Sequence, residues 1–149
     1  MKEYSFEGNF LFYLRLTKRL YENRLSAAAA DLALTLPEAE ILCFLRENPG
    51  FDSARDIATY RDVSRSYVSK AVELLAGKGY LEIAIDKADR RLQHLTITEK
   101  ARPVAETLHQ ALFSFYDTIT SNLTQEEITT LLTLLEKCAE SLTTERSEK

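Results

Sequence analysis

The chain of 149 residues contains only four glycines, three prolines and two cysteines. So little glycine and proline, with no repeat and no low-complexity stretch, argues against a disordered chain. Cys43 and Cys138 lie far apart and form no CxxC pair, which argues against a disulfide scaffold and against an all-cysteine zinc site. Both stand among aliphatic residues of expected helices, so we predict that both are buried, unreactive thiols.

Long apolar runs and enzyme motifs are also missing. No segment approaches the ~18 apolar residues of a membrane span, and the charged N-terminus has no apolar core of signal-peptide length. We therefore expect a cytoplasmic location and no membrane partner. There is no G-x-S-x-G, phosphate-binding glycine loop or HExxH, and no ligand spacing connects His94 with His109. These absences predict a protein that is not an enzyme and has neither a cofactor nor a metal site.

The net charge of −4 and the pI of about 5.3 do not suit a nucleic-acid-binding protein at first sight. The charge is unevenly distributed, however. The segment from Tyr60 to Arg91 carries seven basic and five acidic residues, which leaves −6 for the rest of the chain. Because local charge decides what a surface attracts, this segment remains a candidate for binding an anionic partner.

Apolar residues at three- and four-residue spacing predict helices over about 6–30, 37–47 and 99–122, and again from Thr124, where Thr124 and Glu127 form a capping box. The first of these helices has a second apolar strip that includes Phe12 and Leu16. Both strips could face one core; for a chain of this length we favour a partner chain on the second strip.

The segment from Ser53 to Thr98 is predicted to form a helix-turn-helix followed by a β-hairpin. Ser53 and Ser64 are suitable N-caps of the two helices, and Gly79 suits a left-handed turn after the second. In the first strand Leu81, Ile83 and Ile85 alternate with other residues and predict one buried face. The outward face of the second helix has short polar and cationic side chains, which suit the major groove of DNA: Arg65, Ser66, Tyr67, Ser69 and Lys70.

The hairpin is similar to the wing of the MarR family of bacterial transcription regulators. The stretch from Asp89 to Lys100 has the pattern D-x-R, an alternating strand that ends in Leu-Thr, and a helix start. Lys78-Gly79-Tyr80-Leu81 resembles the family's step out of the recognition helix, and the order of helices agrees over nearly the whole chain. Ala101 stands where the family usually has glycine.

This resemblance implies a mainly α fold with two lobes. Residues 31–99 would form a winged helix-turn-helix DNA-binding lobe, a three-helix core plus a β-hairpin wing. Residues 1–30 and 100–149 would supply the N- and C-terminal helices of a dimerisation lobe. The homodimer would bind a pseudo-palindromic operator in double-stranded DNA, with half-sites about 10 bp apart, and would act as a repressor relieved by a small molecule.

The resemblance also implies a role for each charged residue of the wing tip. Arg91 would enter the minor groove, Asp89 would orient it through a charge-assisted hydrogen bond, and Lys87 and Arg90 would contact phosphates. Asp89 and Arg91 could instead form only a surface ion pair, and the whole lobe could be a protein-interaction module that does not bind DNA.

Relatives that sense small aromatic molecules bind them between the dimer helices and the DNA-binding lobe. The candidate ligand pocket comprises aromatic residues, which could equally be core residues: Phe10, Tyr13, Tyr21, Phe113 and Tyr116.

Overall fold

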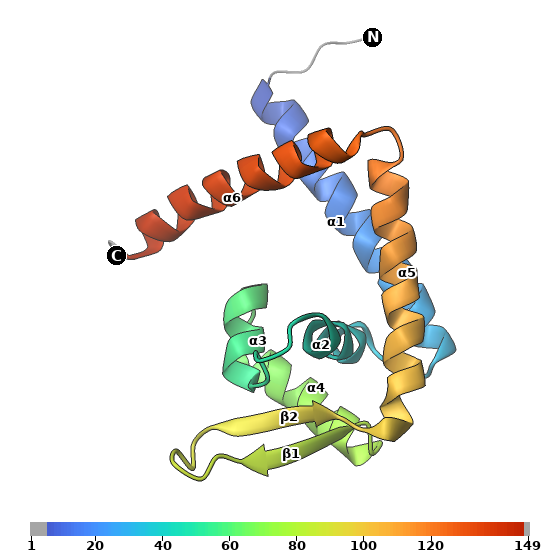
Figure 1. The fold of residues 1–149 in the computed structure, drawn as a ribbon, viewed down its shortest axis with the longest axis vertical. Coiled ribbons are helices and arrows are strands. Elements are labelled where there is room, and N and C mark those ends of the chain that lie inside the picture. The colour runs from blue at the N-terminus through green and yellow to red at the C-terminus, as the bar shows by residue number, and fades with distance from the viewer. Residues whose placement is uncertain (1–5, 148–149) are drawn as a thin grey trace. The chain divides into compact units, whose positions relative to one another are not determined.

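The computed structural model describes residues 6–147, with side chains described for 8–142, and confirms the predicted mainly α fold (Figure 1). The hairpin follows the first four helices and precedes the last two, as predicted. In chain order the elements are α1 Phe6–Asp31, α2 Leu36–Glu47, α3 Ala54–Arg61, α4 Arg65–Gly77, β1 Leu81–Ile85, β2 Gln93–Ile97, the 3-10 turn η1 Glu99–Ala101, α5 Arg102–Thr120 and α6 Gln125–Ser147.

The chain forms two compact units, Met1–Phe115 and Tyr116–Lys149, and the boundary lies within α5. The first unit has a continuous hydrophobic core to which α1 to α5 and the hairpin all contribute. Leu25, Ile41, Val68, Leu75 and Leu108 are at most 1% exposed in it. The functional division into a DNA-binding lobe over 31–99 and dimerisation segments over 1–30 and 100–149 remains a prediction.

The helices of the first unit begin where local hydrogen bonds satisfy their first backbone N–H groups. Thr35 and Glu38 form a capping box at the start of α2, and Ser53 and Asp56 form another at α3. The Ser64 hydroxyl accepts a hydrogen bond from the backbone N–H of Tyr67 and caps α4. These interactions confirm the predicted starts of the two helix-turn-helix helices.

Left-handed backbone conformations connect these helices. Asp62 has φ 52° at the turn between α3 and α4, and Gly79 has φ 70° after α4. Gly79 confirms the predicted left-handed turn, since glycine adopts this conformation without strain. The two turns orient α4 so that one side, formed by Val68, Ala71 and Leu75, is buried in the core.

The strands β1 and β2 form an antiparallel pair in which Leu81 lies opposite Ile97 and Ile83 lies opposite Leu95. The predicted buried face of β1 is wrong: Leu81 is 4% exposed, but Ile83 and Ile85 are 41% and 62% exposed. Helices α2 and α3 pack against β2, and the hairpin extends beyond the helices toward its tip (Figure 1). Leu95, opposite Ile83 on β2, is 3% exposed, so β2 is buried along its middle, whereas β1 is buried only at Leu81.

The first half of α1 is exposed although it is rich in apolar residues. Leu25 and Ala29 are fully buried in the core, whereas Phe10, Phe12 and Tyr13 are 44%, 57% and 60% exposed. In this half of α1 both apolar strips, with Phe10 and Tyr13 on the first and Phe12 on the second, are thus accessible to a partner. No helix within residues 6–147 is long and apolar enough to cross a membrane.

The second unit consists of the end of α5 and all of α6. Apolar side chains of α6 are exposed on it: Leu131, Leu132, Leu134, Leu135 and Leu142. The prediction for Cys138 is wrong, because its thiol is exposed together with this apolar surface. The prediction for Cys43 is confirmed: it is buried, and burial raises the pKa of its thiol to about 12.

Candidate nucleic-acid interface

The first two turns of α4 present the side chains predicted to contact base edges. Arg65, Ser66, Ser69 and Lys70 are all exposed, and the buried stripe of α4 lies on the opposite side. Short hydroxyls next to long cations allow close approach of the helix to a major groove and contact with its phosphates.

Tyr67 belongs to the same turn but has a different environment. Its side chain is 38% exposed, and its hydroxyl donates a hydrogen bond to Glu40 Oε2 at 3.0 Å. Partial burial and the neighbouring Glu40 carboxylate raise the pKa of Tyr67 to about 12. The hydroxyl therefore remains protonated and bound to α2, so the ring is the part of Tyr67 that is available to DNA.

The tip of the wing is held by two aspartates that accept hydrogen bonds from its backbone. Asp86 Oδ1 accepts from the N–H groups of Ala88 and Asp89, both at 2.7 Å. Asp89 Oδ1 accepts from the backbone N–H of Arg91 at 2.9 Å, not from its guanidinium as predicted. A carboxylate two residues before an N–H forms such a turn locally. Among residues 6–147 the Arg91 guanidinium has no ion pair.

The four predicted wing residues, Lys87, Asp89, Arg90 and Arg91, are all exposed at this tip. The candidate interface thus consists of two groups on separate elements, one on α4 and one on the wing, both in the first unit.

His94 lies in β2 between two carboxylates. Its Nδ1 is 2.9 Å from Asp52 Oδ1, and its Nε2 is 3.1 Å from Asp86 Oδ2. A neutral imidazole has one N–H, and an ionised carboxylate can only accept, so both hydrogen bonds form together only when His94 is protonated. The hydrogen bonds to Asp52 and then to Asp86 raise the pKa of His94 above its usual value of 6.5. This cluster fastens the wing tip to the segment before α3.

We expect the hydrogen bonds of His94 to make wing stability depend on pH. Because the folded-state pKa is raised, the stabilisation is fully present below 6.5 and is lost as the pH rises through the folded-state pKa. NMR titration of the imidazole measures that pKa. Asp86→Asn should lower it, whereas Asp89→Asn, in the same turn but bound to Arg91, should not; a pKa equal in native protein and Asp86→Asn would contradict the assignment.

Two buried acids in α2 were not predicted from the sequence. Glu40 is 6% exposed; it forms an ion pair with Arg61 through Oε1 and accepts from Tyr67 through Oε2. Arg61 Nη2 also donates to the Tyr21 hydroxyl at 3.3 Å. These four residues, one from each of α1 to α4, are called the Glu40 cluster below. The available signal was a glutamate between Ala39 and Ile41 on a helix with apolar neighbours on both sides.

Glu38, the second buried acid, is 1% exposed and accepts a hydrogen bond from Lys78 Nζ at 2.7 Å. Burial alone would raise the pKa of Glu38, but hydrogen bonds from Lys78 and Thr35 outweigh this effect and lower it. The start of α2 is therefore joined to the end of α4.

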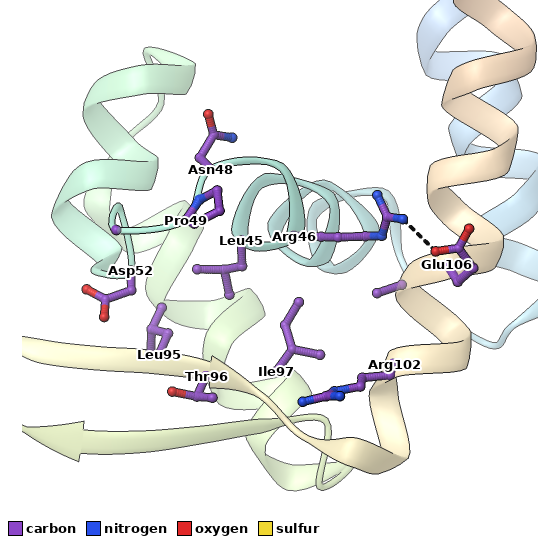
Figure 2. A pocket seen from close by; sticks show the side chains of 12 residues that line it. Leu45, Arg46, Asn48, Pro49, Asp52, Leu95, Thr96, Ile97, Arg102 and Glu106 are labelled. Carbon is purple, nitrogen blue, oxygen red and sulfur yellow. Dashed lines mark hydrogen bonds and ion pairs between the residues drawn. The ribbon is translucent and has the colours of Figure 1, made fainter.

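A cavity of about 420 Å³ lies at the base of the wing (Figure 2). Its apolar lining comes from Leu45 at the end of α2, from Leu95 and Ile97 of β2 and from Ala105 of α5. Figure 2 shows Arg46 on α2 pointing to Glu106 on α5, and their side chains form an ion pair at 2.5 Å. A volume of this size suits a small organic molecule.

The residues predicted to form an aromatic pocket line none of this cavity. Phe10, Tyr13 and Phe113 are exposed in the first unit, and Tyr116 is exposed in the second. Tyr21 is half-buried, packs edge to face against Phe115 and bonds to Arg61. Their role in ligand binding remains a prediction.

Comparison with known proteins finds regulators of the family that the hairpin resembles. A family model described as MarR family matches residues 34–92, which include α2 to α4 and the wing up to Leu92. The HTH-type transcriptional regulator BilQ of Clostridium symbiosum is 25% identical over 131 residues, which cover 88% of this chain and 90% of that protein.

Solved structures share the fold over almost the whole chain. A MarR protein from Peptoclostridium difficile superposes with a TM-score of 0.80, with 25% identity over 97% of this chain and 94% of that chain. The Staphylococcus aureus MepR–DNA complex has a TM-score of 0.75 and 18% identity over 93% of this chain and 99% of that chain.

Proposed function

We propose that this chain is a winged helix-turn-helix transcriptional regulator of the MarR family, two copies of which bind one pseudo-palindromic operator. The observation that carries this proposal is the exposed polar and cationic surface on the first turns of α4, next to a core that fixes its other side. BilQ is a transcriptional regulator, and MepR, which shares the fold, was solved with DNA. They support DNA binding over a protein-interaction module.

In this proposal Arg65, Ser66, Ser69 and Lys70 contact bases and phosphates in the major groove, while Tyr67 contributes its ring. Arg91 enters the adjacent minor groove, where a guanidinium is attracted by the strong negative potential.

Lys87 and Arg90 then contact the flanking phosphates, and Asp89 shapes the backbone that carries Arg91. Their contacts fix register and carry no sequence information of their own.

The homodimer is supported by the apolar surfaces on α1 and α6. Soluble monomers rarely expose so many large aliphatic and aromatic side chains, and a two-fold partner would remove them from water. A dimer also compensates for the acidic chain, because it presents two copies of the basic segment to one operator.

Repression relieved by a small aromatic molecule completes the proposal. Phe10, Tyr13, Tyr21, Phe113 and Tyr116 supply aromatic surface for such a ligand. The cavity at the wing base is a second place for it, since an occupant there would contact both β2 and α5.

Fluorescence anisotropy on DNA flanking the gene of this protein tests the proposal at fixed salt concentration. We expect one dimer per duplex, a Kd on the order of 10 nM or lower, and at least about 1,000-fold weaker binding to a scrambled duplex of equal composition. Equal affinity for both duplexes would contradict sequence-specific regulation. Addition of benzoate or phenol to the complex then tests relief by an aromatic ligand.

A further inference from the structure

We propose that Glu40 and Arg61 are positioning residues that set the orientation of α4 through the Tyr67 hydroxyl, and that Tyr21 connects them to α1. The inference rests on the proposed DNA binding and adds to it residues that do not themselves touch DNA. Helices α1, α2 and α3 thereby determine the orientation in which α4 meets DNA.

The geometry of the Glu40 cluster supports this role. Each carboxylate oxygen of Glu40 has one partner: Arg61 on α3 for Oε1 and Tyr67 on α4 for Oε2. The side chains of Glu40 and Arg61 are only 9% and 21% exposed, so solvent screens their pairing weakly. The Tyr67 hydroxyl lies 3.0 Å from Glu40 Oε2, and a rotation of α4 about its axis would move the two atoms apart.

Stability alone is a poor explanation for such a cluster. A buried ion pair loses much of its Coulombic gain to desolvation, and apolar side chains of similar volume are often at least as stabilising. Arg61 moreover has a buried Nε atom that finds no hydrogen-bond partner within residues 6–147. The hydrogen bonds of the cluster are directional, so they fix the relative orientation of the helices, which apolar contacts do not do.

Tyr67 lies in the part of α4 that is proposed to contact DNA, so the orientation fixed by the cluster affects DNA binding. Tyr67 is the third residue of α4, between Ser66 and Val68, so its tether acts on the turn that carries the exposed polar side chains. Tyr21 connects α1 to the Glu40 cluster, because its hydroxyl accepts a hydrogen bond from the same Arg61 nitrogen that pairs with Glu40. A displacement of α1 at this level would change the hydrogen bonding of Arg61 and, through Glu40, of Tyr67.

Tyr67→Phe tests the proposal because it removes the hydroxyl and keeps the ring. We expect about tenfold weaker binding to the operator identified by anisotropy, because DNA binding must then order the first turns of α4, which the bond to Glu40 no longer holds in place. Binding to the scrambled duplex and the salt dependence should be unchanged, because no phosphate contact is removed. Tyr60→Phe is the matched control, since Tyr60 lies on α3 with 72% of its surface exposed.

Hydrogen exchange without DNA separates positioning from a direct bond between the Tyr67 hydroxyl and DNA. Positioning predicts faster amide exchange confined to the first turns of α4 in Tyr67→Phe, and also in Tyr21→Phe, with a lower unfolding temperature but an intact fold. A direct DNA contact alone would leave exchange in the free protein unchanged.

The Tyr21→Phe/Tyr67→Phe double variant should lose less operator affinity than the sum of the single losses, because both act through Arg61. Unchanged operator affinity and unchanged exchange in Tyr67→Phe would overturn the inference. Failure of the native protein to bind any operator would instead overturn the proposed function.

Discussion

Replacing Leu131 and Leu135 together by aspartate is expected to produce a monomer and to weaken operator binding by at least about a hundredfold. The two leucines lie one turn apart on α6, and each is 43% exposed. Burying two carboxylates in an apolar interface is strongly unfavourable. Once the dimer is lost, the second half-site is no longer bound at the high effective concentration, on the order of millimolar, that a linked partner provides.

Light scattering measures the oligomeric state, and anisotropy measures the affinity. Thr129→Asp/Thr133→Asp is the matched control, since it adds the same charges with the same spacing to exposed polar positions of α6. If the leucine variant remains dimeric and binds the operator normally, α6 does not contribute to the dimer interface as we propose.

Arg91→Ala is expected to weaken operator binding by about ten- to a hundredfold per dimer, because each dimer would lose two guanidinium groups from the DNA. The slope of log affinity against log salt concentration should become less steep by about two, since two fewer protein cations displace condensed counterions from the DNA. The absence of an Arg91 ion pair in the described structure means that no partner has to be displaced first.

A salt titration of both proteins gives affinity and slope together. Lys18→Ala is the control: it removes a cation that is 75% exposed on α1 and paired with Glu22. An Arg91→Ala protein with native affinity and native slope would exclude the wing tip from the interface.

The features that could be predicted from the sequence depend on residues close together along the chain. Ser53, Ser64 and Gly79 marked helix ends correctly, because a cap or a left-handed turn needs a particular side chain at a particular step. The buried stripe of α4 followed from its spacing for the same reason.

The features that could not be predicted depend on what covers a surface. The alternation of Ile83 and Ile85 is that of a strand with a buried face, but within the described residues the helices cover β2, with Leu95 3% exposed, and leave these two side chains of β1 exposed. Cys138 lies on an apolar stripe whose proposed cover is a second copy of the chain. The Glu40 cluster joins residues from positions 21 to 67, a contact that no local pattern reveals.

The two buried acids of α2 have a mechanical consequence. Glu38 holds the end of α4 through Lys78, and Glu40 holds its beginning through Tyr67. Because α4 is tethered at both ends to α2, it cannot slide or pivot independently of α2. The two helices should therefore rotate together as a rigid body. A signal that reaches α2 would then change the distance between the two recognition helices of a dimer, and with it the operator spacing that both can reach, while each helix keeps its own contact surface intact.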